Sequence, residues 1–175
     1  DYDTDGQTLS ARISYEETML KYGTDKPDLR NPLIISDITK IFEREDVKFE
    51  IFKKLVKGGS VVRCLTAKNT KDRPRSFFDN LDKWAKEQGA SGLAYFTIEK
   101  DKKLQAKGPV GKFFSEDSLK EIMKSCKAEV GDSLFLSCGK INEIEKILSI
   151  ARDKIAKDLN LVNENEFKFC WIVDY

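Results

Sequence analysis

The chain has 175 residues, enough for one well-cored domain with extra segments at its ends. Its 31 lysine and arginine residues balance 30 aspartate and glutamate residues, so the overall charge does not attract nucleic acid or an acidic membrane, and any RNA contact must come from a local basic patch. The apolar runs are too short to span a bilayer and no signal stretch is evident, so we expect a cytoplasmic protein without a membrane segment.

The residue types exclude several kinds of site. The chain has no histidine, which removes imidazole as a metal ligand and as the general base of a classical catalytic triad. Cysteine zinc sites usually show closely spaced pairs, whereas the four cysteines here are dispersed. We therefore expect no metal site and no catalytic nucleophile, and we interpret the cysteines as reduced, buried side chains: Cys64, Cys126, Cys138 and Cys170.

The first predicted element is a short helix. Ser14-Tyr15-Glu16-Glu17 fits a capping box, and Gly23 suits the left-handed position just past a helix end. The run from Tyr22 to Arg30 then forms a charged turn, because Pro27 prevents the helix from continuing. The acidic and basic side chains of this turn can pair locally or face water.

Capping and β-propensity predict the next two features. Ser36 is expected to cap a short helix through residues 38–42. Residues 49–56 and 61–68 are rich in β-forming side chains and are separated by a Lys-Gly-Gly-Ser turn at residues 57–60. These two runs are therefore predicted to pair as a hairpin.

The rest of the chain alternates helical and strand patterns. Apolar residues recur at helical spacing in three stretches, residues 77–87, 119–126 and 142–160, and Ser115 precedes the second of them. A second hairpin and two single strands are predicted at residues 93–106, 133–137 and 167–173. Strand pairs that alternate with single helices predict an α+β fold, with a mostly antiparallel sheet covered by helices on one face.

Two groups of basic residues are candidate contacts for an RNA backbone, because correctly placed cations are sufficient for phosphate contact. The first basic cluster is Lys71, Arg73 and Arg75, and the second basic cluster is Lys102, Lys103, Lys107 and Lys112. The alternative is that these residues only keep the surface soluble, since acidic residues neighbour both clusters. Residues 108–112 lack the glycine spacing and the hydroxyl of a phosphate-binding P-loop, which favours a simple turn there.

Two segments carry a resemblance to a known family. The run Tyr22-Gly-Thr-Asp-Lys-Pro-Asp-Leu-Arg resembles the segment that follows the second signature motif of bacterial-type aspartyl-tRNA synthetases, and the closing Trp171-Ile172-Val173-Asp174-Tyr175 is similar to the strand that returns to that family's catalytic core. The residues between them resemble the inserted GAD domain, which implies a DCoH-like two-layer arrangement. The resemblance implies three parts: a core flank at residues 1–35, the GAD domain at residues 36–165, and a core strand at residues 166–175. Residues 1–10 do not match the family.

The resemblance also implies a function. The parent enzyme would be a homodimer that activates aspartate with ATP and magnesium and transfers it to tRNA. Neither the arginine-bearing second motif nor the glycine-rich third motif is present, so we expect no catalytic residues in this chain. We also expect it to hold no cofactor and no metal and to be a monomer. An alternative is a tRNA-binding or adaptor domain of a tRNA-dependent amidotransferase subunit, which shares this domain type but fits the two end segments less well. An independent enzyme is disfavoured because no nucleophile motif is present.

Overall fold

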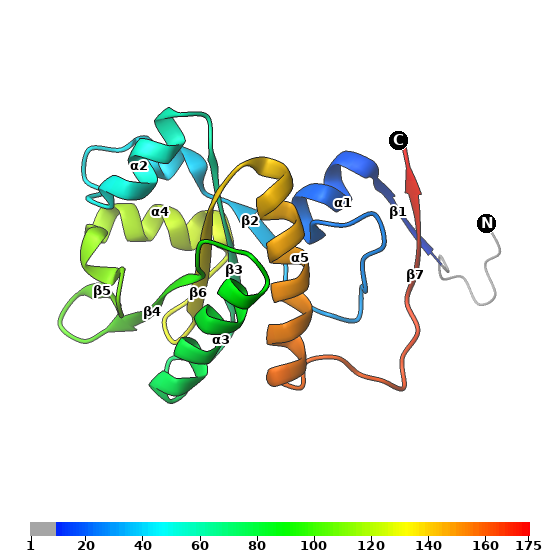
Figure 1. Cartoon of the computed structure of the whole chain (residues 1–175). Helices are drawn as coiled ribbons and strands as arrows, with labels where there is room; N and C mark the ends of the chain where they lie inside the picture. Colours follow the sequence, from blue (N-terminus) through cyan, green and yellow to red (C-terminus); the bar gives the residue numbers. More distant parts are fainter. Residues whose placement is uncertain (1–9) are drawn as a thin grey trace.

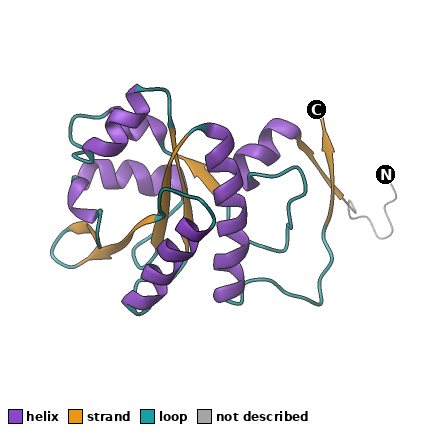
Figure 2. Ribbon diagram, in the orientation of Figure 1, coloured by secondary structure: helices purple, strands orange, loops and turns teal. Residues whose placement is uncertain are grey.

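The computed structural model describes residues 10–175 and alternates strands with single helices (Figures 1 and 2). The helices are α1 (Tyr15–Tyr22), α2 (Glu50–Lys57), α3 (Arg75–Glu87), α4 (Glu116–Cys126) and α5 (Ile141–Asp158), with 3-10 turns η1 (Thr39–Glu43) and η2 (Gly111–Phe113). The strands are β1 (Ser10–Ser14), β2 (Ile35–Asp37), β3 (Val61–Ala67), β4 (Ala94–Lys100), β5 (Leu104–Lys107), β6 (Ser133–Gly139) and β7 (Phe169–Val173). None of the described helices is both long and apolar enough to cross a membrane.

Five of these strands form the main sheet, in the order β2-β3-β6-β4-β5. Each neighbouring pair is antiparallel, which confirms the α+β class and the antiparallel sheet expected from the sequence. The central strands β3 and β6 are apolar on both faces. Val62 and Cys64 belong to the core on one side of the sheet, and Leu65 and Ala67 belong to the core on the other side.

Helices cover both faces of this sheet, so the arrangement has three layers where two layers with one covered face were expected (Figure 1). The elements η1, α2 and α4 pack on the Val62 face, and α3 and α5 pack on the Leu65 face. Phe78 of α3 is buried, and its ring stacks on Tyr95 with the centroids 4.4 Å apart. The aromatic face of α3 therefore packs against the core, with Phe78 buried and Phe77 and Trp84 partly buried.

Most of the other expected elements are present. Helix α1 begins at Ser14, whose hydroxyl accepts a hydrogen bond from the Glu17 N–H over 3.1 Å, and it ends at Gly23 with a φ of 69°. Helix α4 begins at Ser115, whose hydroxyl accepts from the Ser118 N–H over 3.0 Å. The hairpin of β4 and β5 and the helices α3 and α5 are also close to their expected ranges. These predictions are confirmed.

The predicted hairpin of residues 49–56 with residues 61–68 is wrong, because α2 replaces its first strand. Phe49, Phe52 and Val56 recur at helical spacing and join the core beside α4. The Phe49 and Phe52 rings stack with centroids 4.2 Å apart. The helical period of the buried residues therefore prevails over their individual β-propensities.

The predicted helix cap at Ser36 is also wrong. Ser36 lies in β2, where it pairs with Cys64 of β3. The following turn is the short 3-10 turn η1, and the Asp37 carboxylate accepts the Thr39 N–H over 2.9 Å at its start. The capping function therefore moves one residue along the chain, because Ser36 is used by the sheet.

A separate two-stranded sheet joins the two ends of the described chain. Strands β1 and β7 are parallel, with Ser10 opposite Phe169 and Ser14 opposite Val173 (Figure 1). The side chains of Phe169 and Trp171 are 69% and 63% exposed. The sequence mismatch noted at residues 1–10 lies, apart from Ser10, outside the described residues.

Candidate RNA-binding surface and sheet-edge pocket

Lys71 and Arg73 of the first basic cluster lie in the loop between β3 and α3, and Arg75 is the first residue of α3. Hydrogen bonds that this loop donates to the loop before β6 hold its backbone. The Asn69 N–H donates to the Asp132 carboxylate over 3.0 Å, and the Lys71 N–H donates to the Gly131 carbonyl over 3.0 Å. Asp132 is 1% exposed, so this anchor is shielded from water. The loop is therefore held in place while its basic side chains remain exposed.

The cations of this cluster differ in how they are paired. Arg75 forms an ion pair with Asp79 one helical turn later, at 3.3 Å. The Arg73 guanidinium lies over the Phe77 ring, 5.8 Å from its centroid. Among residues 10–175, no carboxylate lies within 4.0 Å of the Lys71 ammonium. Lys71 and Arg73 thus keep positive charge available for an anionic partner.

The second basic cluster lies on the β4–β5 hairpin and on η2. Lys102 and Lys103 occupy the exposed hairpin turn, and Lys107 at the end of β5 forms an ion pair with Glu99 at 3.3 Å. The Lys112 ammonium lies over the ring of the next residue, 5.3 Å from its centroid. Within the described part of the chain, Lys102, Lys103 and Lys112 form no ion pair. Three of the four cations are therefore not neutralised.

The strand register places the two clusters near the same end of the sheet. Ala67, Ser133, Thr97 and Lys107 follow one another across β3, β6, β4 and β5. Neighbouring strands are about 4.8 Å apart, so this row spans roughly 14 Å. The first cluster leaves β3 just after Ala67, and the second includes Lys107 itself. The structure thus joins two groups that are distant in sequence, and RNA contact by them stays a prediction.

Residues 108–112 form a tight turn, and Gly111 has a packing role. A Cβ atom at Gly111 would lie 2.4 Å from the Ala106 carbonyl oxygen, so no larger residue fits without a backbone shift. Among residues 10–175, no group of three or more cysteine or acidic side chains could hold a metal ion.

The charged turn at residues 22–30 pairs with itself, as the sequence allowed. The Arg30 guanidinium donates to both Asp28 carboxylate oxygens, the shorter contact being 2.8 Å, and Lys26 pairs with Asp25 at 2.9 Å. The hydrogen bond from Arg30 holds the pKa of Asp28 below its usual range, and Lys26 does the same for Asp25. Both carboxylates are therefore ionised at neutral pH.

A buried arginine of α5, which the sequence analysis missed, holds the other side of this turn. Arg152 is 1% exposed and donates hydrogen bonds to the carbonyls of Leu33 and Asn31, each over 2.6 Å, and of Asp28 over 2.8 Å. Its guanidinium also lies over the Tyr22 ring, 4.8 Å from the centroid. Burial lowers the pKa of the Arg152 guanidinium below its ordinary value. One side chain thus fixes three backbone positions after α1.

The spacing of α5 contains a signal for this arrangement. Position 152 is four residues after Leu148 and three before Ile155, so it lies on the same apolar stripe of the helix. A charged residue on a buried stripe needs hydrogen-bond partners to offset its loss of hydration. The apolar members of the stripe predicted the helix, and Arg152 is the cation among them.

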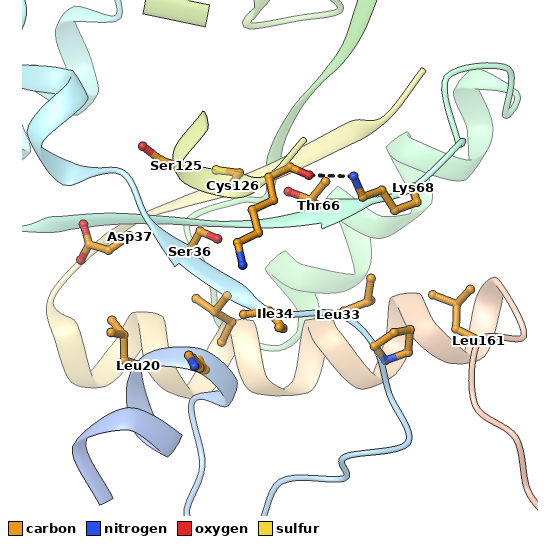
Figure 3. A pocket seen from close by; sticks show the side chains of 14 residues that line it. Leu20, Leu33, Ile34, Ser36, Asp37, Thr66, Lys68, Ser125, Cys126 and Leu161 are labelled. Carbon is orange, nitrogen blue, oxygen red and sulfur yellow. Dashed lines mark hydrogen bonds between the residues drawn. The ribbon is translucent and has the colours of Figure 1, made fainter. Parts of the chain in front are cut away.

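A pocket of about 450 Å³ opens at the β2 edge of the sheet, between α1 on one side and the end of α4 on the other (Figure 3). Leu20, Ile34 and Leu161 give it an apolar lining. The Thr66 hydroxyl is buried in the wall and has no hydrogen-bond partner among residues 10–175. The last residue of α4, Cys126, also lines this sheet-edge pocket. No sequence pattern indicated it, because five separate segments build it.

Comparison with known proteins identifies the domain that contains both basic clusters. Residues 52–148, more than half of the chain, match the GAD domain. The chain belongs to the GAD domain family. All seven residues of the two basic clusters lie inside the matched GAD region. In contrast, α1, the turn at residues 22–30 and Arg152 lie outside it.

Several relatives extend the similarity beyond the GAD domain itself. The chain is 74% identical over 164 residues to an aspartate-tRNA(Asp/Asn) ligase of Pelagibacter ubique (strain HTCC1062). Ligases of the same name from Wolbachia sp. subsp. Drosophila simulans (strain wRi) and Methylocella silvestris are 48% and 47% identical over 165 residues. Each alignment covers 94% of this chain but only 28%, 27% and 26% of the respective relative. The chain thus spans little more than a quarter of the length of these relatives.

Proposed function

We propose that this GAD domain chain is the inserted accessory region of an aspartate-tRNA ligase. The observation that carries the proposal is the alignment of 94% of the chain, at 74% identity, with 28% of one such ligase. The parent enzyme would be a cytoplasmic homodimer that activates aspartate with ATP and magnesium and transfers it to tRNA. Because the relatives are named as ligases for both the aspartate and the asparagine tRNA, we extend both substrates to the parent.

The proposed parts of the chain are residues 1–35 as a flank of the catalytic core, residues 36–165 as the GAD domain, and residues 166–175 as a strand of the core. The small sheet of β1 and β7 supports this division, since it is separate from the five-stranded sheet. Parallel strands are normally covered on both faces, and two strands alone are marginally stable. The exposed Phe169 and Trp171 are then the face on which the rest of the catalytic core packs.

An assay of aspartate activation distinguishes the role of the chain from that of its parent enzyme. Stabilisation of the reacting phosphate charge requires preorganised cations and donors, which the family places in motifs that this chain lacks. Aspartate-dependent exchange of pyrophosphate into ATP is measured for the monomeric chain and for the longer protein encoded by the same gene. We expect exchange by the longer protein only. Exchange by the chain above an empty-vector control contradicts its non-catalytic role, and no exchange by the longer protein contradicts the ligase assignment.

Within this function, we propose that the two basic clusters contact the tRNA backbone. Lys71, Lys102 and Lys103 are exposed, lie inside the GAD match and have no carboxylate within 4.0 Å in the described chain. Nearby acids at Glu99 and Asp132 lower the local positive charge, so binding is expected to be weak. Each lost phosphate contact reduces the salt dependence of binding, because fewer counterions are released.

Filter binding of tRNA to the chain over a range of salt concentrations tests this contact. Replacing Lys71, Lys102 and Lys103 with glutamine should weaken binding at low salt and reduce the slope of log K against log salt by about 2 to 3. The matched control is Lys157→Gln, an exposed lysine on α5 outside the GAD match, which should leave both quantities unchanged. Binding that is insensitive to salt, or equal binding by the triple variant, contradicts the contact without affecting the ligase assignment.

A further inference from the structure

The fold places two cysteines in direct contact that are far apart in sequence. The sulfur atoms of Cys64 in β3 and Cys126 at the end of α4 are 3.1 Å apart. Both are free thiols in the interior of the GAD region. A spacing of 62 residues gives no sign of this pair in the sequence, and only the packing of α4 on β3 creates it.

The two thiols differ in access. Cys64 is 0% exposed and lies behind its partner, whereas Cys126 is 8% exposed and lines the sheet-edge pocket. Figure 3 shows Cys126 among the side chains that surround this opening. A small reagent that enters the pocket therefore meets Cys126 first.

We propose that Cys64 and Cys126 form a modification site at which a low-molecular-weight disulfide converts two thiols into one protein disulfide. The Cys126 thiolate attacks one sulfur of the reagent and displaces a thiolate, which leaves a mixed disulfide on Cys126. Cys64 then loses its proton to solvent and attacks Cys126 Sγ, which displaces the second thiolate. The reagent is reduced to two thiols, and the two cysteines are oxidised to a disulfide.

The geometry favours the second step. A disulfide bond is about 2.05 Å long, so the sulfurs need to approach by only about 1 Å from their present separation. Helix α4 ends at Cys126, because Lys127 is a left-handed helix cap with a φ of 50°. A small displacement of Cys126 therefore disturbs no helical turn beyond it. The hydrogen bond to Cys126 and burial both raise the pKa of Cys64, so this step should be faster at alkaline pH.

The other two cysteines provide matched controls. Cys138 in β6 is 6% exposed and lines a different pocket, of about 490 Å³, and Cys170 in β7 is half-buried. Neither has a sulfur partner among the described residues. Cys138 also has a pKa raised to about 11 by burial, so it should stay reduced. A specific disulfide must therefore join Cys64 to Cys126.

The test uses the whole chain carrying Cys170→Ser, incubated with hydroxyethyl disulfide, quenched with acid and analysed by mass spectrometry. We expect a loss of about 2 Da and about two fewer titratable thiols in denaturant, both reversed by dithiothreitol. Cys138→Ser should give the same result. In Cys64→Ser, or Cys64→Ala if serine impairs folding, the mixed disulfide should instead accumulate on Cys126. In Cys126→Ser, neither product should form while the chain is folded.

The proposal is overturned if the folded chain keeps its thiols while the urea-unfolded chain is oxidised, or if Cys64→Ala acquires no adduct on Cys126. Peptide mapping that places the disulfide on Cys138 also overturns it. Circular dichroism of each variant establishes that it is folded before the reagent is added, so that loss of reactivity is assigned to the thiol and not to unfolding.

Discussion

Two strand pairs of this chain differ sharply in what covers them. In the antiparallel pair of β3 and β6, Val62, Leu65 and Phe135 are each 0% exposed. In the parallel pair of β1 and β7, Phe169 and Trp171 are more than half exposed. The first pair is enclosed by helices on both faces, whereas the second lies apart from the main sheet and contributes no residue to the two apolar clusters (Figure 2).

This difference separates a self-sufficient domain from a segment that depends on its neighbours. The five-stranded sheet and its helices bury two continuous apolar clusters, which supply the main driving force for folding. The flank has no comparable core. It is held through Arg152, which ties the chain after α1 to α5, and through pairing of β1 with β7. The stability of the flank should therefore be lower than that of the GAD region.

The largest expected effect comes from truncation in the enclosed region. Leu148 on α5 is 0% exposed, and Leu148→Ala leaves a cavity under the sheet, so it should reduce the free energy of unfolding by roughly 2 to 5 kcal/mol. Urea unfolding measures this loss. The control is Lys146→Ala on the same helix, outside the apolar clusters, which should change the free energy of unfolding by no more than about 0.5 kcal/mol. Equally mild effects would show that the apolar stripe of α5 is not core.

In this enclosed region, the individual helices and strands could be predicted from the sequence better than their arrangement in layers. Caps at Ser14 and Ser115 and the apolar stripe of α5 fix where helices begin and which face is buried. The cover on both faces is only partly visible in the sequence: residues 62–67 and 133–138 are almost all buried, but Arg63, Thr66, Ser133 and Ser137 interrupt the apolar runs that are typical of strands buried on both sides. In residues 49–56, β-forming side chains at helical spacing gave conflicting signals, and packing against the core selects the helix.

The candidate sites are less predictable because several segments build each one. The residues of the basic clusters were identified from the sequence. Their position at the same end of the sheet depends on the strand order, which sequence spacing does not encode. The contact of Cys64 with Cys126 and the pocket beside it depend on tertiary packing in the same way. Arg152 is the exception, because its position on an apolar stripe could have been read directly.

An intermediate effect is expected at the connection between the two regions. Arg152→Met keeps the volume of the side chain but leaves the carbonyls of Leu33, Asn31 and Asp28 without this donor. Each buried group left unpaired costs about 1 to 3 kcal/mol, and removal of a buried charge offsets part of that loss. We expect a loss of about 1 to 3 kcal/mol. The substitution should accelerate amide hydrogen exchange, relative to the unmodified chain, more in residues 24–34 than in β3 or β6.

The control for this change is Arg73→Met, an exposed arginine in the β3–α3 loop, which should leave the free energy of unfolding within about 0.5 kcal/mol of the unmodified chain. If Arg152→Met keeps full protection of residues 24–34, the turn is held by other contacts. In that case the flank would be more independent of α5 than the comparison of the two regions implies.

The smallest effect in the chain alone is expected at the open face of the small sheet. Trp171 is 63% exposed, so Trp171→Ala removes few contacts and should change the free energy of unfolding by no more than about 0.5 kcal/mol. In the longer parent protein, the proposed catalytic core covers this face, and the same substitution should cost roughly 3 to 5 kcal/mol, as for a buried tryptophan. Urea unfolding of both proteins with and without the substitution measures the difference. A mild effect in both would show that Trp171 stays exposed in the parent and that β7 is not a strand of an enclosed catalytic core.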